Sequence, residues 1–162
     1  MNPYTAPANT RIGHVHLKVA DLEIALSFYH TLLGFELMQS YGTEAAFVSA
    51  GGYHHHIGLN TWYSKNGPRA EERSAGLFHT AIVYPTRKDL ANILKRLADA
   101  EYPLTGASDH GVSQALYLYD PDGNVVELYW DRPREEWPVD SEGKLHMVTE
   151  KLDLQELIAL AD

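Results

Sequence analysis

GHVHLKV at residues 13–19 and LFHTAIV at residues 77–83 are the two stretches that decide the fold of this chain. Each is a short apolar segment with a histidine near its start, and the interval from His14 to His79 is 65 residues. Self-similarity at a fixed interval is typical of a supersecondary unit that occurs more than once. The sequence therefore predicts two copies of one unit.

Each copy continues with a helical pattern and then three strand-like segments. Asp21 is a plausible N-cap for the first helix, and Thr86 with Asp89 resembles a capping box at the start of the second. The apolar positions behind both caps recur at helical spacing. The expected strands lie at residues 35–41, 45–49, 53–61, 102–107, 113–119 and 125–130.

These elements predict an α+β fold made of two βαβββ modules in one domain, residues 11–131. Module one covers residues 11–62, a polar linker covers 63–76, and module two covers 77–131. A sheet of this size on its own has two free edges and a bare face, so we expect the two mixed sheets to curl around a common cavity. Residues 132–162 form an extension whose short helix is expected to pack on the outside of the domain.

Composition and charge exclude several classes of function. Thirteen Lys and Arg residues face 22 Asp and Glu residues, and the formal net charge of −9 opposes binding to nucleic acid or to an anionic membrane surface. The chain has no cysteine, which excludes disulfides, thiolate metal sites and a cysteine nucleophile. No apolar run approaches the roughly 18 residues of a membrane span. The first residues also lack a signal-peptide core, so a cytoplasmic protein is expected.

Two histidines and one glutamate are the candidate chemistry. His14 and His79 occupy matching positions in the two copies, and Glu127 lies in the middle of an apolar strand pattern. A carboxylate in such a place needs a cation or strong donors. Two imidazoles and a carboxylate form the facial triad that suits non-haem Fe(II) and also accommodates Mn(II). Zn(II) or Ni(II) would be equally plausible if a fourth protein ligand joined.

Three stretches also resemble a known superfamily. HVHLKVADL at residues 14–22 looks like the opening of the vicinal oxygen chelate superfamily. This superfamily includes glyoxalase I, extradiol ring-cleaving dioxygenases, fosfomycin-resistance enzymes and bleomycin-binding proteins. GGYHHHIGLNTW at 51–62 and HGVSQALYLYDPDGNVVE at 110–127 are similar to its catechol-2,3-dioxygenase-like branch. The resemblance covers residues 11–131 and implies paired βαβββ modules cupped around a divalent metal.

The resemblance also implies roles for individual residues. His14, His79 and Glu127 match the three metal ligands of the superfamily. His110 and Tyr117 match a histidine and a tyrosine that orient the substrate and the oxygen-derived intermediate. The implied activity is an extradiol-type dioxygenase that uses Fe(II) and O2 on a catecholic or related vicinal-oxygen substrate.

The histidine triplet at residues 54–56 supplies a further candidate. Counting back from the glycine turns makes Gly52 the counterpart of Gly123, and His56 the counterpart of Glu127. We therefore expect His56 to face the cavity as a base or as a fourth metal ligand. Histidine suits the role of base because its charge changes near neutral pH.

Other functions of the same fold stay open at this point. A glyoxalase-like isomerase or lyase would share most of the ligands and would use nickel, zinc or cobalt without oxygen. A metal-free protein that binds a planar drug or metabolite would share the fold alone, because one scaffold hosts several chemistries. An exposed sheet edge also makes a homodimer plausible.

Overall fold

The computed structural model describes residues 3–71 and 73–162 of the chain. They divide into two compact units, each with its own sheet. Unit 1 is Met1–His30 with Gly34–Pro68, and unit 2 is Thr31–Leu33 with Arg69–Asp162. Both sheets are mixed and carry few helices, which confirms the predicted α+β fold.

Unit 1 has the order βαβββ, and its sheet runs β1-β4-β3-β2. The parallel pair is β1 with β4, and the other pairs are antiparallel. The expected N-cap is confirmed, because Asp21 Oδ1 accepts a hydrogen bond from Ile24 N at 3.0 Å. The elements are β1 (Val15–Lys18), α1 (Leu22–Leu26), the π-helical turn η1 (Ser27–Leu32), β2 (Glu36–Tyr41), β3 (Ala45–Ser49) and β4 (Ile57–Asn60).

Unit 2 repeats this order, and its sheet runs β5-β8-β7-β6-β9. Again the first strand pairs in parallel with the last strand of the module, β8. The fifth strand, β9, comes from the C-terminal extension and pairs with β6. The elements are β5 (Thr80–Val83), α2 (Arg87–Asp99), β6 (Gly106–Asp109), β7 (Ser113–Tyr119), β8 (Val125–Asp131), the 3-10 turn η2 (Arg134–Glu136), β9 (Glu150–Lys151) and α3 (Leu154–Ile158).

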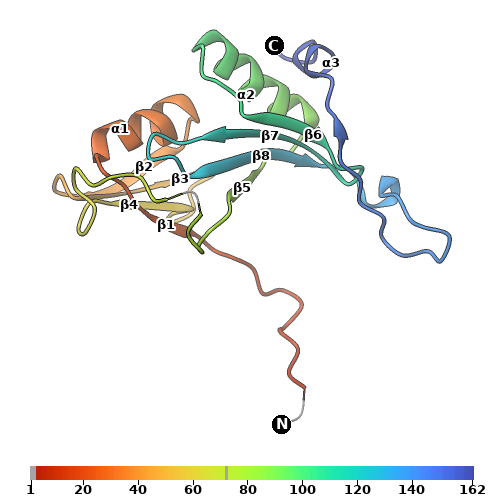
Figure 1. Cartoon of the computed structure of the whole chain (residues 1–162), viewed down its shortest axis with the longest axis horizontal. Helices are drawn as coiled ribbons and strands as arrows, with labels where there is room; N and C mark the ends of the chain where they lie inside the picture. Colours follow the sequence, from red (N-terminus) through yellow and green to blue (C-terminus); the bar gives the residue numbers. More distant parts are fainter. Residues whose placement is uncertain (1–2, 72) are drawn as a thin grey trace. The chain divides into compact units, whose positions relative to one another are not determined.

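Helix α2 covers one face of the unit 2 sheet, and α3 lies beside α2 (Figure 1). The predicted capping box is confirmed, because Thr86 Oγ1 accepts from Asp89 N at 3.1 Å and Thr86 N donates to Asp89 Oδ2 at 3.1 Å. Leu90, Leu94 and Leu97 form the buried stripe of the helix. The other face of the sheet is left for the side chains of the candidate site.

Two predicted strands lie elsewhere than expected. The strand expected at 53–61 begins only at Ile57, and the strand expected at 102–107 is β6, Gly106–Asp109. After α2 the chain first reverses through Glu101, whose φ is 52°, and Tyr102 N donates to Leu97 O at 2.9 Å. These local hydrogen bonds close the helix, so strand pairing starts later than the apolar pattern indicates.

The helix of the extension is anchored by one buried leucine. Leu157 of α3 is fully buried, whereas Leu160 is 40% exposed. We expect Leu157→Ala to lower the free energy of unfolding by about 2 to 5 kcal/mol, the usual cost of such a cavity. Urea unfolding monitored by circular dichroism measures it. Leu160→Ala is the matched control, and an equal loss in both variants would contradict the packing of α3.

Candidate functional site

Unit 2 brings His79 and Glu127 together on the sheet face opposite α2. His79 lies directly before β5, and Glu127 lies in the middle of the neighbouring parallel strand β8. His79 Nε2 lies 3.0 Å from Glu127 Oε2, and the carboxylate is nearly buried. A buried carboxylate is stable only when it is paired or bound by donors. The two predicted ligands of module two are therefore neighbours.

Tyr117 and His110 extend this pair into a line of hydrogen bonds. Tyr117 lies on β7 directly opposite Glu127 in the strand register, and its hydroxyl donates to Glu127 Oε1 at 3.0 Å. His110 Nε2 lies 2.9 Å from the same hydroxyl. All four residues that the sequence names in module two are thus connected, from His79 through Glu127 and Tyr117 to His110.

A backbone carbonyl beside His110 determines which of its two ring nitrogens carries the proton. His110 Nδ1 lies 3.1 Å from the carbonyl oxygen of Val148, and a carbonyl oxygen can only accept. The ring proton of neutral His110 is therefore on Nδ1, and Nε2 then competes with Glu127 Oε1 for the single proton of the Tyr117 hydroxyl. When the ring is doubly protonated, Nε2 donates to that hydroxyl, and the hydroxyl can donate to Glu127. The protonation state of His110 thus decides the direction of the Tyr117 proton.

The phenol of Tyr117 holds its proton more tightly than an ordinary tyrosine. Burial first, and then the negative charge of Glu127 beside it, raise the pKa of Tyr117 to about 12. The hydroxyl therefore remains a donor at neutral pH. A neutral donor next to a carboxylate is suited to protonating or orienting an oxygen of a bound substrate.

The donor atoms of unit 2 fit a divalent cation. Ligand atoms about 2.0 to 2.2 Å from one ion and at right angles to each other lie about 3 Å apart, as Nε2 and Oε2 do here. His79 Nδ1 is buried and has no hydrogen-bond partner among residues 3–71 and 73–162. A cation on Nε2 would place the ring proton on Nδ1 and would satisfy the carboxylate at the same time. Neither unit alone, over its described residues, brings together three or more His, Asp or Glu side chains able to hold a metal.

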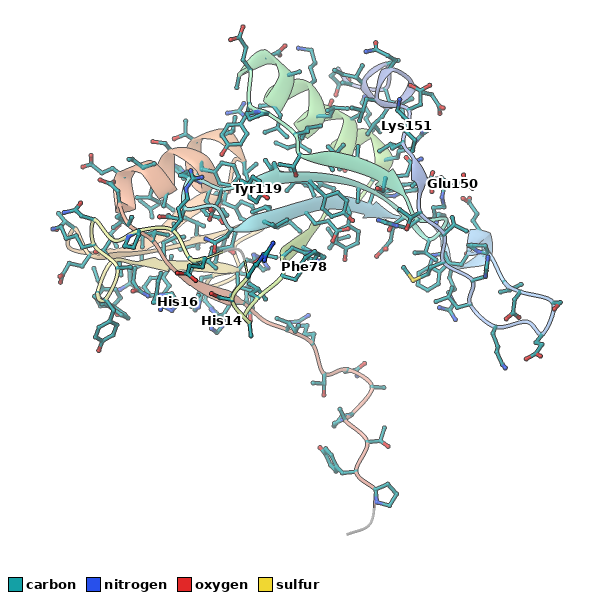
Figure 2. All side chains as sticks on the ribbon, in the orientation of Figure 1. His14, His16, Phe78, Tyr119, Glu150 and Lys151 are labelled. Atoms are coloured by element: carbon teal, nitrogen blue, oxygen red, sulfur yellow. The ribbon has the colours of Figure 1, made fainter. Side chains whose placement is uncertain are left out.

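In unit 1 the matching histidine, His14, lies in a group of histidine rings. His14 and His16 lie close together where β1 begins (Figure 2). The ring centroid of His55 is 4.3 Å from that of His14, and His54 Nδ1 lies 2.8 Å from His55 Nδ1. Burial first, and then the charge of His14, lower the pKa values of His16 and His55. These rings are therefore kept neutral, the form that binds metals and accepts protons.

The strand register corrects the predicted counterpart of Glu127. His14 precedes β1 as His79 precedes β5, and the parallel partners are His16 with Gly58 in unit 1 and Ala81 with Glu127 in unit 2. Gly58, not His56, therefore matches Glu127. A Cβ at Gly58 would lie 2.9 Å from the ring of His16, so the histidine side chain lies directly against the glycine. In unit 1 the large residue of the pair, His16, is on the first strand and the small one, Gly58, is on the last. In unit 2 the small residue, Ala81, is on the first strand and the large one, Glu127, is on the last.

His56 is held by other groups. Its Nδ1 accepts from the backbone N–H of Ala50 at 3.3 Å and lies 2.9 Å from Ser49 Oγ. The nitrogen that could take up a proton is thus already occupied, so the structure adds no support to His56 as a base. His55, which the sequence analysis does not single out, contacts His14 instead. Neighbouring histidines look alike in sequence, so no local signal separates them.

Comparison with known proteins identifies the family of the chain. Residues 11–128 match the family model described as Glyoxalase/Bleomycin resistance protein/Dioxygenase superfamily. The chain belongs to this superfamily. A glyoxalase/dioxygenase from Nostoc punctiforme shares the superfamily fold with a TM-score of 0.65 at 20% identity, over 82% of this chain and 99% of that chain.

The curated relatives that match the chain include dioxygenases by name. The chain is 38% identical over 151 residues to a catechol-2,3-dioxygenase of Bacillus subtilis, across 93% of this chain and 52% of that protein. It is 31% identical over 121 residues to a biphenyl-2,3-diol 1,2-dioxygenase of Rhodococcus globerulus, across 75% of this chain and 63% of that protein. The chain thus spans only about half to two thirds of these relatives. Among the described residues, no helix of this superfamily member has the length and apolar character of a membrane crossing.

Proposed function

We propose that the chain is a metal-dependent oxidoreductase, an extradiol-type dioxygenase that cleaves the ring of a catecholic substrate with Fe(II) and O2. The observation that carries the proposal is the line from His79 through Glu127 and Tyr117 to His110. It combines a pair of metal-binding groups with a pair of proton-handling groups. The names of the two dioxygenase relatives support the same substrate class.

The proposed metal ligands are His14, His79 and Glu127. His79 and Glu127 are adjacent in unit 2, and His14 holds the matching position of the repeat in unit 1. Two imidazoles and one carboxylate leave positions for other ligands and suit Fe(II). A bound ion would supply sites for the two vicinal oxygens of the substrate and for O2, and so would bring both reactants together.

The side chains of unit 2 would handle the protons. A catechol gives up a proton when it binds through both oxygens, and we assign its uptake to His110, reached through Tyr117. The Tyr117 hydroxyl passes its own proton to Nε2 of neutral His110 as it receives the substrate proton, so the phenol stays neutral. Because Nδ1 of His56 is occupied, we give this role to His110 instead.

Oxygen consumption tests the proposed reaction. Metal-free protein is loaded anaerobically with Fe(II), Mn(II), Ni(II) or Zn(II) in separate samples. Catechol and biphenyl-2,3-diol are then added in an oxygen electrode. We expect the Fe(II) sample to consume one O2 for each substrate molecule. The matched control is the same Fe(II) sample with a monohydroxy phenol, which lacks the second vicinal oxygen and should consume none.

Two outcomes would replace this proposal with another function. Turnover of a hemithioacetal by the Ni(II) or Zn(II) sample, with no catechol consuming O2, would indicate a glyoxalase-like isomerase or lyase. Purified protein without stoichiometric metal, whose binding of aromatic compounds is unchanged in Glu127→Ala, would indicate a metal-free binding protein.

A further inference from the structure

We propose that the C-terminal extension, residues 132–162, is a positioning element for His110. The backbone carbonyl of Val148 holds the ring proton on Nδ1 and so directs Nε2 to the Tyr117 hydroxyl. The extension lies beyond residues 11–128, the part of the chain that matches the superfamily model. The consequence for turnover rests on the proposed function, whereas the assignment of the ring proton does not.

Two hydrogen bonds join the same two residues in opposite directions. Val148 N donates to His110 O at 3.1 Å, and His110 Nδ1 donates to Val148 O at 3.1 Å. The backbone of His110 is held on its other side by the bond from His110 N to Ser113 O at 2.8 Å. The side chain and the backbone of His110 are thus both fixed, and Val148 supplies one bond to each.

The extension is anchored before and after Val148, so its carbonyl is not free to move away. On the upstream side, Arg132 N donates to Val112 O at 2.8 Å, and the Arg132 guanidinium pairs with Asp109. On the downstream side, Glu150 pairs with Asp109 in the strand register of β9 and β6. Glu150 and its neighbour Lys151 lie where the extension returns along the sheet (Figure 2).

Asp109 contacts both anchored parts of the extension and the turn that follows His110. Its carboxylate accepts from Gly111 N at 2.9 Å and from Gln114 Nε2 at 2.8 Å, besides the pair with Arg132. Burial alone would raise the pKa of Asp109, but these hydrogen bonds and the charge of Arg132 lower it. The carboxylate is therefore charged at neutral pH and holds both the turn and the start of the extension.

The turn after His110 is shaped to receive the extension. Gly111 has a φ of 75°, which favours glycine. A Cβ at this position would lie 2.9 Å from Pro138 Cγ and 3.3 Å from Val148 Cγ2. Two residues of the extension therefore pack against the turn so closely that only glycine fits between them. A tail lying loosely on the surface would not impose this requirement.

The position of the ring proton is measurable without any activity. In alkaline buffer, where histidine rings are neutral, long-range proton–nitrogen NMR correlations identify which ring nitrogen of His110 carries the proton. The His110 signals are assigned by their loss in His110→Gln. We expect Nδ1 to be protonated in the full-length protein. Nε2 protonated there would overturn the proposal, whether or not the protein turns over a catechol.

A pair of variants tests whether Val148 is responsible. Val148→Pro removes the N–H that donates to His110 O, whereas Val148→Ala keeps the backbone and removes only methyl groups. We expect the proton to leave Nδ1 in Val148→Pro and to stay there in Val148→Ala. If Val148→Pro does not fold, Gly111→Ala displaces the same contact from the other side and gives the same readout. An unchanged His110 spectrum in the variant that folds would overturn the proposal.

Kinetics then connect the ring proton to the reaction. If the proposed dioxygenase activity is present, Val148→Pro should lower kcat roughly tenfold or more, as for other groups that orient a functional side chain. KM should stay unchanged, because Val148 acts through His110. Glu142→Ala, at the exposed tip of the extension, should change neither the spectrum nor kcat. Equal kcat losses in Glu142→Ala and Val148→Pro would show a merely structural role and would overturn the proposal.

Discussion

Glu127→Ala is expected to remove metal binding and turnover together. The carboxylate is the partner of His79 Nε2 at 3.0 Å and the acceptor for Tyr117, so its loss leaves both groups without their central contact. Groups that only support a metal ligand cost about 10- to 100-fold in affinity when they are removed. Loss of the proposed ligand itself should therefore weaken Fe(II) binding by more than about 100-fold. Metal content after dialysis and a metal-binding titration measure this effect.

Asp131→Ala is the matched control for this variant. Asp131 lies on the same strand and the same sheet face as Glu127, but it is exposed at the strand end. Its removal changes the net charge equally and should leave metal binding intact. Stoichiometric Fe(II) in Glu127→Ala would contradict the proposed ligand set. An equal loss in Asp131→Ala would show that general charge, rather than coordination, holds the ion.

Tyr117→Phe should lower kcat by about 100- to 10,000-fold while the protein keeps its metal. The substitution removes one oxygen, the atom that links Glu127 with His110. Loss of a positioned proton donor or acceptor costs about that factor. Because both proposed unit 2 ligands are untouched, Fe(II) binding should change little. Steady-state oxygen uptake and metal content, measured on the same preparation, separate the two effects.

Tyr119→Phe provides the comparison for the second variant. Tyr119 lies two residues further along β7, on the same face, with its side chain 45% exposed. It loses the same oxygen atom and should retain normal kcat. A Tyr117→Phe protein with normal kcat would contradict the proton-handling role of the line. A Tyr117→Phe protein that has also lost its metal would instead show that the hydroxyl supports Glu127 as a ligand.

The close approach of His79 and Glu127 could be predicted from local patterns. A histidine before one strand and a glutamate inside an apolar strand are both visible in the sequence. The βαβββ order then makes the first and last strands of the module neighbours, as β5 and β8 are. His110 and Tyr117 are singled out by the resemblance to the superfamily, and Tyr117 lies opposite Glu127 because β7 and β8 form one hairpin.

The assignment of His56 shows where such reasoning stops. Counting from glycine turns aligns His56 with Glu127, but the observed pairing aligns Gly58 with it. A small error in register gives a residue the wrong partners along the strand, and register depends on pairing between distant segments. The space at Gly58 is filled by His16, a residue 42 positions earlier in the chain. Counting residues along the sequence could not have revealed this contact.

The sequence by itself determines that this chain has two βαβββ units, because apolar periodicity, helix caps and the repeat interval are local properties. It also determines which side chains are available to bind a metal or move a proton. The tertiary structure alone decides the register that makes Gly58 the partner of His16, and the return of residues 132–162 to His110. The group that contacts His110 is a backbone carbonyl, which every residue carries. Only its place in space gives it a role.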